Sequence, residues 1–294
     1  MTTTTQPKLG VVFPQIEFPS DPILIRDYAQ TAEGLGYDYF LVYDHVLGAN
    51  PERPGGWQGP YTHTDPFQEP FVLFGYLAGL TQTLEFVTGI LILPQRQTAL
   101  VAKQAAQVDV LSGGRLRLGI GVGWNAVEYE ALNENFHNRG KRSEEQIELL
   151  QKLWTEELVT FNGKYHTVSD AGLNPMPVQR PIPIWFGGYA DATFRRMAKY
   201  GSGWFPASTP LPKALPMIEK IHRALRDEGR DPADFGIDPW ISVGSSTPDV
   251  WAERAIAWQE AGATHIAVNT MRAGFTKVEE HLGVLRRFKE VVDV

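Results

Sequence analysis

The 294-residue chain contains no cysteine, which excludes disulfide bonds, thiolate metal sites and cysteine nucleophiles. It also lacks an excess of basic residues, because 27 lysines and arginines stand against 34 aspartates and glutamates, a formal net charge of −7. A strongly basic face is the usual mark of proteins that bind nucleic acid or anionic membranes. We therefore expect neither kind of partner.

Long apolar runs are absent as well. The longest, Phe71 to Leu80, covers about ten residues, fewer than a membrane-spanning helix needs. The amino-terminal stretch MTTTTQP has neither the basic nor the apolar region of a signal peptide. These features predict a cytoplasmic protein.

Two common catalytic signatures are missing. The seven histidines stand isolated, without an HxH or HExxH spacing or a tight carboxylate cluster, so no catalytic metal is expected. No GxSxG sequence supports a serine hydrolase.

What the chain does have is a regular alternation of short apolar runs and longer helical patterns. Apolar strands separated by helices are typical of a parallel sheet covered by helices, and eight such units favour a closed barrel. We predict one (β/α)8 TIM-barrel domain over residues 1–294. Strands are expected at 9–13, 39–42, 84–93, 116–122, 182–186, 203–205, 240–243 and 265–268, and helices at 23–35, 70–81, 100–111, 191–200 and 248–260, with others ending near 226 and 291.

Two segments break this alternation. Residues 48–66 form a long polar loop after the second strand, on the side where barrel active sites lie. Residues 157–181 contain Asn162-Gly163 between two strand-like runs, which predicts an inserted hairpin within the same domain.

Glycines follow two of the expected strands. Residues Gly119 to Gly123 have a GxGxG spacing, which is not the dinucleotide-binding GxGxxG pattern. Gly187-Gly188 runs directly into a helix and can form a phosphate cradle from backbone N–H groups. Tight packing explains both glycine groups equally well.

Polar and aromatic residues near strand ends are further candidates. Asp44 and His45 end the second strand and can bind or protonate a ligand, although a lone histidine is more often structural. Four tryptophans can wall a ring-shaped pocket or simply belong to the core: Trp57, Trp124, Trp185 and Trp204. Charged residues expected on solvated helix faces are Glu128, Glu130, Glu134, Arg139, Lys141 and Arg142.

Four stretches, in this order, resemble the luciferase-like monooxygenase family, and in particular its branch of coenzyme F420-dependent oxidoreductases. They are Tyr43-Asp44-His45, Thr88-Gly89-Ile90-Leu91, Leu111 to Arg115 continuing into Gly119 to Asn125, and Trp185-Phe186-Gly187-Gly188. The resemblance extends from Leu9 to the last helix. It implies the same β/α barrel that the alternation predicts.

The resemblance also implies roles for individual residues. His45 is expected beside the deazaflavin ring as the catalytic proton donor or acceptor, and a bulge with a cis non-prolyl peptide is expected at Gly89–Ile90. The phosphate of the cofactor would be held at Gly187 and Gly188. The complete set of expected cofactor-binding residues is Asp44, His45, Thr88, Gly89, Ile90, Gly121, Val122, Gly123, Trp124, Asn125, Gly187, Gly188, Tyr189 and Ala190.

The chain departs from one member of this branch. A sugar-phosphate dehydrogenase of the branch has a second proton-transfer glutamate just after the GxGxG stretch, where this chain has Trp124. That substrate is therefore in doubt, and a tryptophan favours a hydrophobic or planar one. Basic residues near the mouth would suit the acidic tail of F420. The candidates are Arg96, Arg139, Lys141 and Arg142, with a solvated helix face as the expected role of the last three.

The resemblance thus implies hydride transfer between the deazaflavin C5 and a small organic substrate. One alternative is an FMN-dependent monooxygenase that uses reduced flavin and O2. A second alternative is a non-catalytic flavin-binding barrel, which predicts a blocked pocket or a His45 that points away from it. Expected partners are a reductase that supplies reduced flavin or F420, and a second copy of the chain in a homodimer.

Overall fold

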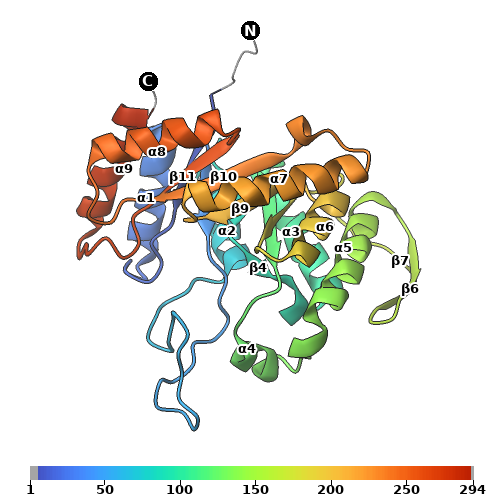
Figure 1. Ribbon diagram of the computed structural model, residues 1–294. Helices are drawn as coiled ribbons and strands as arrows, with labels where there is room; N and C mark the ends of the chain where they lie inside the picture. Colours follow the sequence, from blue (N-terminus) through green and yellow to red (C-terminus); the bar gives the residue numbers. More distant parts are fainter. Residues whose placement is uncertain (1–5, 293–294) are drawn as a thin grey trace.

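The computed structural model describes residues 6–292, and these residues form a closed barrel of parallel strands (Figure 1). Hydrogen bonds join the strands in the order β3-β2-β1-β11-β10-β9-β8-β5, and a further pairing of β3 with β5 closes the ring. The predicted (β/α)8 barrel is confirmed. The strands are β1 (Lys8–Val12), β2 (Tyr39–Val42), β3 (Glu85–Thr88), β4 (Leu91–Ile92), β5 (Leu116–Gly121), β8 (Ile184–Gly187), β9 (Gly203–Ala207), β10 (Gly236–Ser242) and β11 (His265–Asn269).

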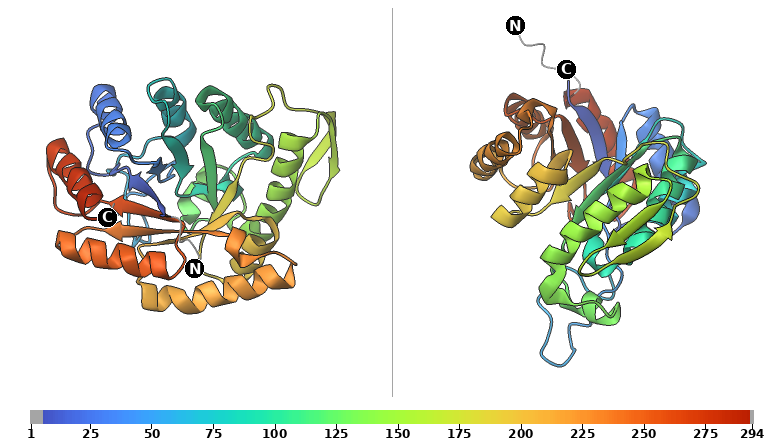
Figure 2. Two further views of the ribbon diagram at one scale, coloured as in Figure 1. Left: turned by 90° about the horizontal axis from the view of Figure 1, so that it is seen from above. Right: turned by 90° about the vertical axis from the view of Figure 1, so that its right-hand side faces the viewer.

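Helices cover the outside of the barrel, as the view from above in Figure 2 shows. They are α1 (Pro22–Gly34), α2 (Pro70–Ala78), α3 (Thr98–Ser112), α4 (Ala126–Ala131), α5 (Arg139–Thr155), α6 (Asp191–Tyr200), α7 (Leu211–Asp227), α8 (Pro248–Glu260) and α9 (Val278–Val292), with short 3-10 turns η1 (Leu93–Gln95), η2 (Phe136–Asn138) and η3 (Pro232–Asp234). None of the helices described between residues 6 and 292 combines the length and the apolar character needed to cross a membrane.

Local capping chemistry sets where several helices begin and end. Asp21 accepts hydrogen bonds from the N–H groups of Ile23 and Leu24 at the start of α1, which satisfies donors that have no partner within the helix. At the other end of α3, Gly113 adopts a φ of 71°, a left-handed conformation that glycine takes without steric cost. The helix predicted over 100–111 is thus confirmed as α3, which ends at Ser112.

The third strand is interrupted. The sequence predicted one strand over 84–93, whereas the structure divides it into β3 and β4 around a cis peptide bond between Gly89 and Ile90. The cis peptide that the resemblance implied at this position is confirmed. The interruption lies at the carboxyl end of the barrel, where Ile90 reaches the cavity described below.

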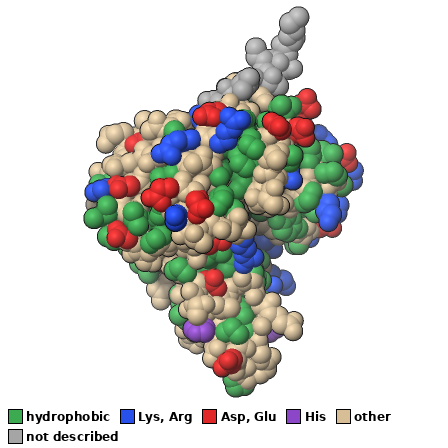
Figure 3. Space-filling model, turned by 90° about the vertical axis from the view of Figure 1, so that its left-hand side faces the viewer, with side chains coloured by type: hydrophobic (Ala, Val, Ile, Leu, Met, Phe, Trp, Pro, Cys, Tyr) green, Lys and Arg blue, Asp and Glu red, His purple; other side chains and the backbone are tan. Residues whose placement is uncertain are grey.

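The inserted hairpin is confirmed as the antiparallel pair β6 (Val159–Asn162) and β7 (Thr167–Ala171), which lies outside the barrel beside α5. The long loop after β2 also appears as expected. It extends from the carboxyl end of the barrel, and Figure 3 shows it as part of the lower projection of the molecule.

The prediction of a solvated face at the start of α5 is wrong for Arg142. Its side chain is 7% exposed, and its guanidinium donates hydrogen bonds to the carbonyl oxygen of Pro94 and to Glu134. The charge is buried because these two acceptors replace water around it. Arg142 therefore joins α5 to the turn after the interrupted third strand.

An ionic cluster fills the amino-terminal half of the barrel interior. Arg117 donates to Asp238 at 3.0 Å, and its guanidinium lies 4.5 Å from the ring centroids of both Tyr39 and Trp185. Tyr39 donates a second hydrogen bond to Asp238 at 2.6 Å. Burial raises the pKa of Asp238 to about 6, although the bonds from Arg117 and Tyr39 act in the opposite direction. This packed floor closes the barrel below the cavity.

Candidate functional site

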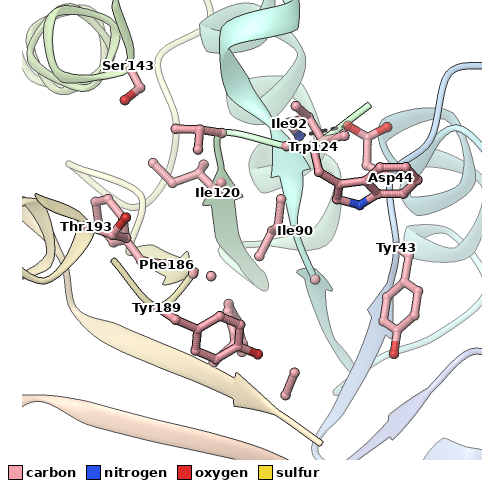
Figure 4. Close-up of a pocket in the computed structure, with 18 of the residues that line it drawn as sticks. Tyr43, Asp44, Ile90, Ile92, Ile120, Trp124, Ser143, Phe186, Tyr189 and Thr193 are labelled. Atoms are coloured by element: carbon pink, nitrogen blue, oxygen red, sulfur yellow. Dashed lines mark hydrogen bonds between the residues drawn. The ribbon is translucent and has the colours of Figure 1, made fainter. Parts of the chain in front are cut away.

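A cavity of about 480 Å³ opens at the carboxyl ends of the strands (Figure 4). Its walls come from the ends of β2, β4, β5, β8, β9 and β10 and from the segments that follow them. This size is usual for a small-molecule pocket, roughly 300–1,000 Å³. The carboxyl end is also where barrel enzymes carry their active sites.

Most of the residues predicted for the site meet in this cavity. Those that line it are Asp44, His45, Gly89, Ile90, Gly121, Val122, Gly123, Trp124, Gly187, Gly188 and Tyr189. Three others do not line it. Thr88 is buried in the barrel and donates to the carbonyl oxygen of Gly119, Asn125 caps α4 by accepting from the N–H of Val127, and Ala190 stands at the start of α6.

The glycines at the strand ends allow close packing around Ile90. A Cβ on Gly121 would lie 2.5 Å from the Ile90 side chain, and a Cβ on Gly187 would lie 3.0 Å from it. Deeper in the barrel, a Cβ on Gly119 would meet the carbonyl oxygen of Thr88 at 1.9 Å. Packing thus explains Gly119 fully, whereas Gly121 and Gly187 both pack on Ile90 and present backbone to the cavity.

Asp44 is held in a network behind the cavity wall. It is 3% exposed, and its two oxygens accept hydrogen bonds from the backbone N–H of Ile92 at 3.0 Å and from Arg96 at 2.8 Å. Arg96 also donates to Glu69 at 3.0 Å. The guanidinium of Arg96, a candidate for binding an acidic ligand, is therefore already neutralised by two carboxylates.

His45 borders the cavity and contacts a buried carboxylate. Its Nδ1 lies 3.3 Å from Oε1 of Glu128, whose side chain is fully buried. The imidazole is otherwise surrounded by aromatic rings, with centroids 4.8 Å away for Phe67, 5.0 Å for Tyr61 and 5.6 Å for Trp124. A histidine in this position can exchange a proton with a ligand in the cavity.

The prediction that Glu128 belongs to a solvated helix face is wrong. Its Oε1 also accepts from the backbone N–H groups of Val46 and Leu47, at 2.8 and 3.3 Å, and its Oε2 accepts from Gln95 at 3.2 Å. Burial by itself would raise the pKa of Glu128, but the hydrogen bonds from His45, Gln95 and Leu47 and the charge of His45 lower it below its usual value. Glu128 is therefore ionised at neutral pH.

The sequence spacing around Glu128 is typical of a different interaction, a helix capping box. Glu128 is the third residue of α4, after the capping residue Asn125, which is the spacing of a capping box. In that motif the glutamate returns to the start of its own helix. Here it reaches across to the end of β2 instead.

The opposite end of the cavity is polar. Ser143, Thr193 and Arg196 line it next to Gly187 and Gly188. The first turn of α6 has no side-chain cap, and Arg196 is 9% exposed with its Nε donating to Glu144 at 2.9 Å. Sequence reasoning found the glycines but missed Arg196.

Aromatic side chains make up much of the remaining wall. Tyr43 stacks on Trp240 with ring centroids 5.2 Å apart, and burial raises the pKa of the Tyr43 hydroxyl well above its usual value, so this group stays neutral. The Nε1 atom of Trp240 is buried and has no hydrogen-bond partner among residues 6–292, which leaves one donor for a ligand. Phe205 completes this side of the cavity.

Three of the four candidate tryptophans, Trp57, Trp185 and Trp204, do not line the cavity. Trp185 packs on Arg117 in the barrel floor, and Trp204 is buried, with its Nε1 donating to the carbonyl oxygen of Gly188 at 3.0 Å. Both residues belong to strands, and both side chains are buried. Trp124 does line the cavity, and Trp57 packs on the ring of Trp124 from outside the lining, with ring centroids 5.7 Å apart.

Comparison with known proteins gives consistent similarities. A sequence model described as luciferase-like monooxygenase matches residues 12–287. The chain is 32% identical over 183 residues to the FMNH2-dependent dimethylsulfone monooxygenase of Pseudomonas putida, covering 61% of this chain and 47% of that protein. It is 27% identical over 241 residues to the F420-dependent hydroxymycolic acid dehydrogenase of Mycobacterium tuberculosis, covering 80% of this chain and 63% of that one.

A solved structure shows the same fold. An F420-dependent secondary alcohol dehydrogenase in complex with an F420-acetone adduct superimposes with a TM-score of 0.80 at 18% sequence identity, covering 98% of this chain and 99% of that one.

Proposed function

The chain belongs to the luciferase-like monooxygenase family, and we propose that within this family it is an F420-dependent oxidoreductase. It would transfer a hydride between the C5 atom of the deazaflavin and a small hydrophobic or planar organic substrate. The observation that carries the proposal is His45, which follows β2 in the wall of an aromatic cavity and contacts the ionised Glu128. The F420-dependent relative, which matches 80% of the chain, supports this choice of cofactor.

The cavity has features that fit such a cofactor. Its polar end has the exposed backbone of Gly187 and Gly188, the uncapped start of α6 and the cation of Arg196, which together suit a phosphate group. Its other walls are apolar and aromatic, which suits a planar ring. The buried, unpartnered Nε1 of Trp240 leaves a donor for a polar atom of a ligand.

The cofactor supplies the hydride chemistry, and the chain supplies binding, orientation and a proton-transfer group. Arg196, Ser143 and Thr193 would hold the phosphate, and the aromatic walls would exclude water. His45 would accept the proton that a substrate releases when it is oxidised, or donate one when it is reduced. Trp124 would extend the apolar wall and select a hydrophobic or planar substrate.

FMN is the alternative cofactor, and the 32% identity to an FMNH2-dependent monooxygenase favours it. In that case reduced flavin from a partner reductase would be used with O2. We also propose that two copies of the chain form a homodimer. The non-catalytic alternative predicted a blocked pocket or an outward His45, and neither is seen in the described residues, because the cavity is open and His45 borders it.

Fluorescence titration of the purified protein with F420 and, separately, with FMN tests the proposal. Each cofactor is added in its oxidised and reduced forms. Tight binding of F420 with weak binding of FMN is the expected result. The reverse preference would overturn the F420 proposal and direct the work to O2-dependent turnover and to a flavin reductase.

A further inference from the structure

The carboxylate of Glu128 makes more hydrogen bonds to the segment that follows β2 than packing alone requires. The carboxylate contacts four hydrogen-bond donors from two separate segments. His45, Val46 and Leu47 belong to one segment, and Gln95 belongs to the other. The three donors of the β2 end meet at one oxygen, Oε1. The side chain has no exposed surface, so water does not compete for these bonds.

This arrangement determines which nitrogen of His45 carries the proton. An ionised carboxylate is only an acceptor, so the Nδ1 of His45 that faces it must be the protonated nitrogen. Within residues 6–292, the Nε2 of His45 has no hydrogen-bond partner. In the neutral imidazole its lone pair is therefore available to a ligand.

We propose that Glu128 is the positioning residue of His45, which fixes the Nδ1–H tautomer and balances the charge of the imidazolium. This inference rests on the proposed function, in which His45 exchanges a proton with the substrate. For each hydride that leaves the substrate, one proton from a substrate oxygen or nitrogen binds Nε2 of His45. The Nδ1 proton stays in place, and Glu128 remains ionised throughout.

The same pair also explains how the chain functions with Trp124 at the position of the second glutamate of the related sugar-phosphate dehydrogenase. Glu128 stands one helical turn later and points to the back of His45 rather than into the cavity. It thus supports one proton-transfer group instead of adding a second. The cavity side of His45 keeps an apolar neighbour, Trp124.

Glu128→Gln tests the inference with little change of shape. The amide oxygen can still accept from Val46 and Leu47. Its NH2 group would face Nε2 of Gln95, and it can donate to Gln95 once that amide turns over and presents its Oε1 instead. The variant therefore loses the negative charge while the hydrogen bonds of the fold are kept. Glu130→Gln is the matched control, because Glu130 lies on the same helix but is exposed.

The first measurement is the tautomer of His45 in the ligand-free protein, from long-range 1H–15N correlation spectra assigned with a His45→Asn variant. We expect the proton on Nδ1 in the wild type, in Glu130→Gln and in Glu128→Gln, whose amide oxygen still accepts from Nδ1–H, and a clear fall of that fraction in Glu128→Met, which removes the acceptor. An Nε2–H tautomer in the wild type, or no change in Glu128→Met, would overturn the inference.

The second measurement is turnover. Because general acid–base catalysis contributes roughly 10²–10⁴-fold to a rate, kcat of Glu128→Gln should fall about tenfold or more while KM and cofactor affinity stay close to wild type. An unchanged kcat would contradict the inference. Absence of cofactor binding in the wild type would instead count against the proposed function, whereas the tautomer measurement needs neither cofactor nor substrate.

Discussion

The carboxylate of Asp44 accepts a hydrogen bond from the backbone N–H of Ile92 at 3.0 Å, and this bond links the end of β2 to the interrupted third strand. Its other oxygen holds Arg96. Ile92 lines the cavity, as Asp44 does, whereas Arg96 does not. Asp44 thus fixes the segment that carries Ile90 and Ile92, in addition to any contact with a cofactor.

This relationship predicts a graded loss of stability. Asp44→Ala removes both hydrogen bonds and leaves Arg96 with Glu69 as its remaining carboxylate, so unfolding in urea should require about 3 kcal/mol less free energy. Asp44→Asn keeps an acceptor for Ile92 and should cost about half as much. If both variants unfold like the wild type and lose only cofactor affinity, Asp44 is a ligand contact rather than a structural one.

Arg196 provides a direct test of the phosphate end of the cavity. Arg196→Met keeps most of the buried side-chain volume but removes the cation, so affinity for the preferred cofactor should fall about tenfold or more, in line with about 1.5–3 kcal/mol for a charged hydrogen bond. The matched control is Arg195→Met, because Arg195 is exposed on the same helix. Fluorescence titration measures both variants. Equal effects of the two substitutions would show that Arg196 is not at the phosphate.

Those two arginines also illustrate what could be predicted from the sequence. His45 and Gly188 were found because each follows an apolar strand, and the carboxyl ends of parallel strands meet at one end of a barrel. Glu128 and Arg196 lie on helices next to residues of the same charge, Glu130 and Arg195. The rotation of each helix on the barrel decides which of the pair faces inward, and that rotation depends on long-range packing that local patterns do not contain.

The fold likewise has features that local sequence patterns predict and features that depend on long-range packing. The alternation of strands and helices predicted the barrel and placed a helix at 100–111, within α3. The burial of Arg142 could not be predicted, because its partners, the carbonyl oxygen of Pro94 and the carboxylate of Glu134, come from segments that are irregular in sequence. From the sequence alone a charged residue is expected to face solvent, because the acceptors that would allow its burial cannot be identified.

Trp124 should control substrate choice. It lines the cavity near His45 and is 43% exposed, so a glutamate is tolerated there. Trp124→Glu should lower kcat/KM for hydrophobic or planar substrates relative to polar ones by about tenfold, the usual scale for a changed pocket contact. Trp57→Phe, outside the cavity, is the control. An unchanged preference in Trp124→Glu would remove the basis for a hydrophobic or planar substrate.

His265 should make the protein less stable in acid. It packs against Tyr39 and Trp185 at the barrel floor, and burial, with the nearby charges of Arg117 and Lys8, lowers its pKa to about 2. The unfolded chain, with a histidine pKa of about 6.5, binds one more proton below that pH than the folded chain does. This contribution is therefore fully present above about pH 6.5 and is lost as the pH falls toward 2.

His265→Gln removes this titration, whatever its effect on stability at neutral pH. Between pH 7 and pH 5, the free energy of unfolding of the wild type should fall by about 2 kcal/mol more than that of the variant, because each pH unit below the unfolded pKa costs about 1.4 kcal/mol. Urea unfolding at several pH values measures the two slopes. Parallel slopes would mean that His265 is protonated in the folded protein as readily as in the unfolded chain, and that the ionic floor around Arg117 accommodates the added charge.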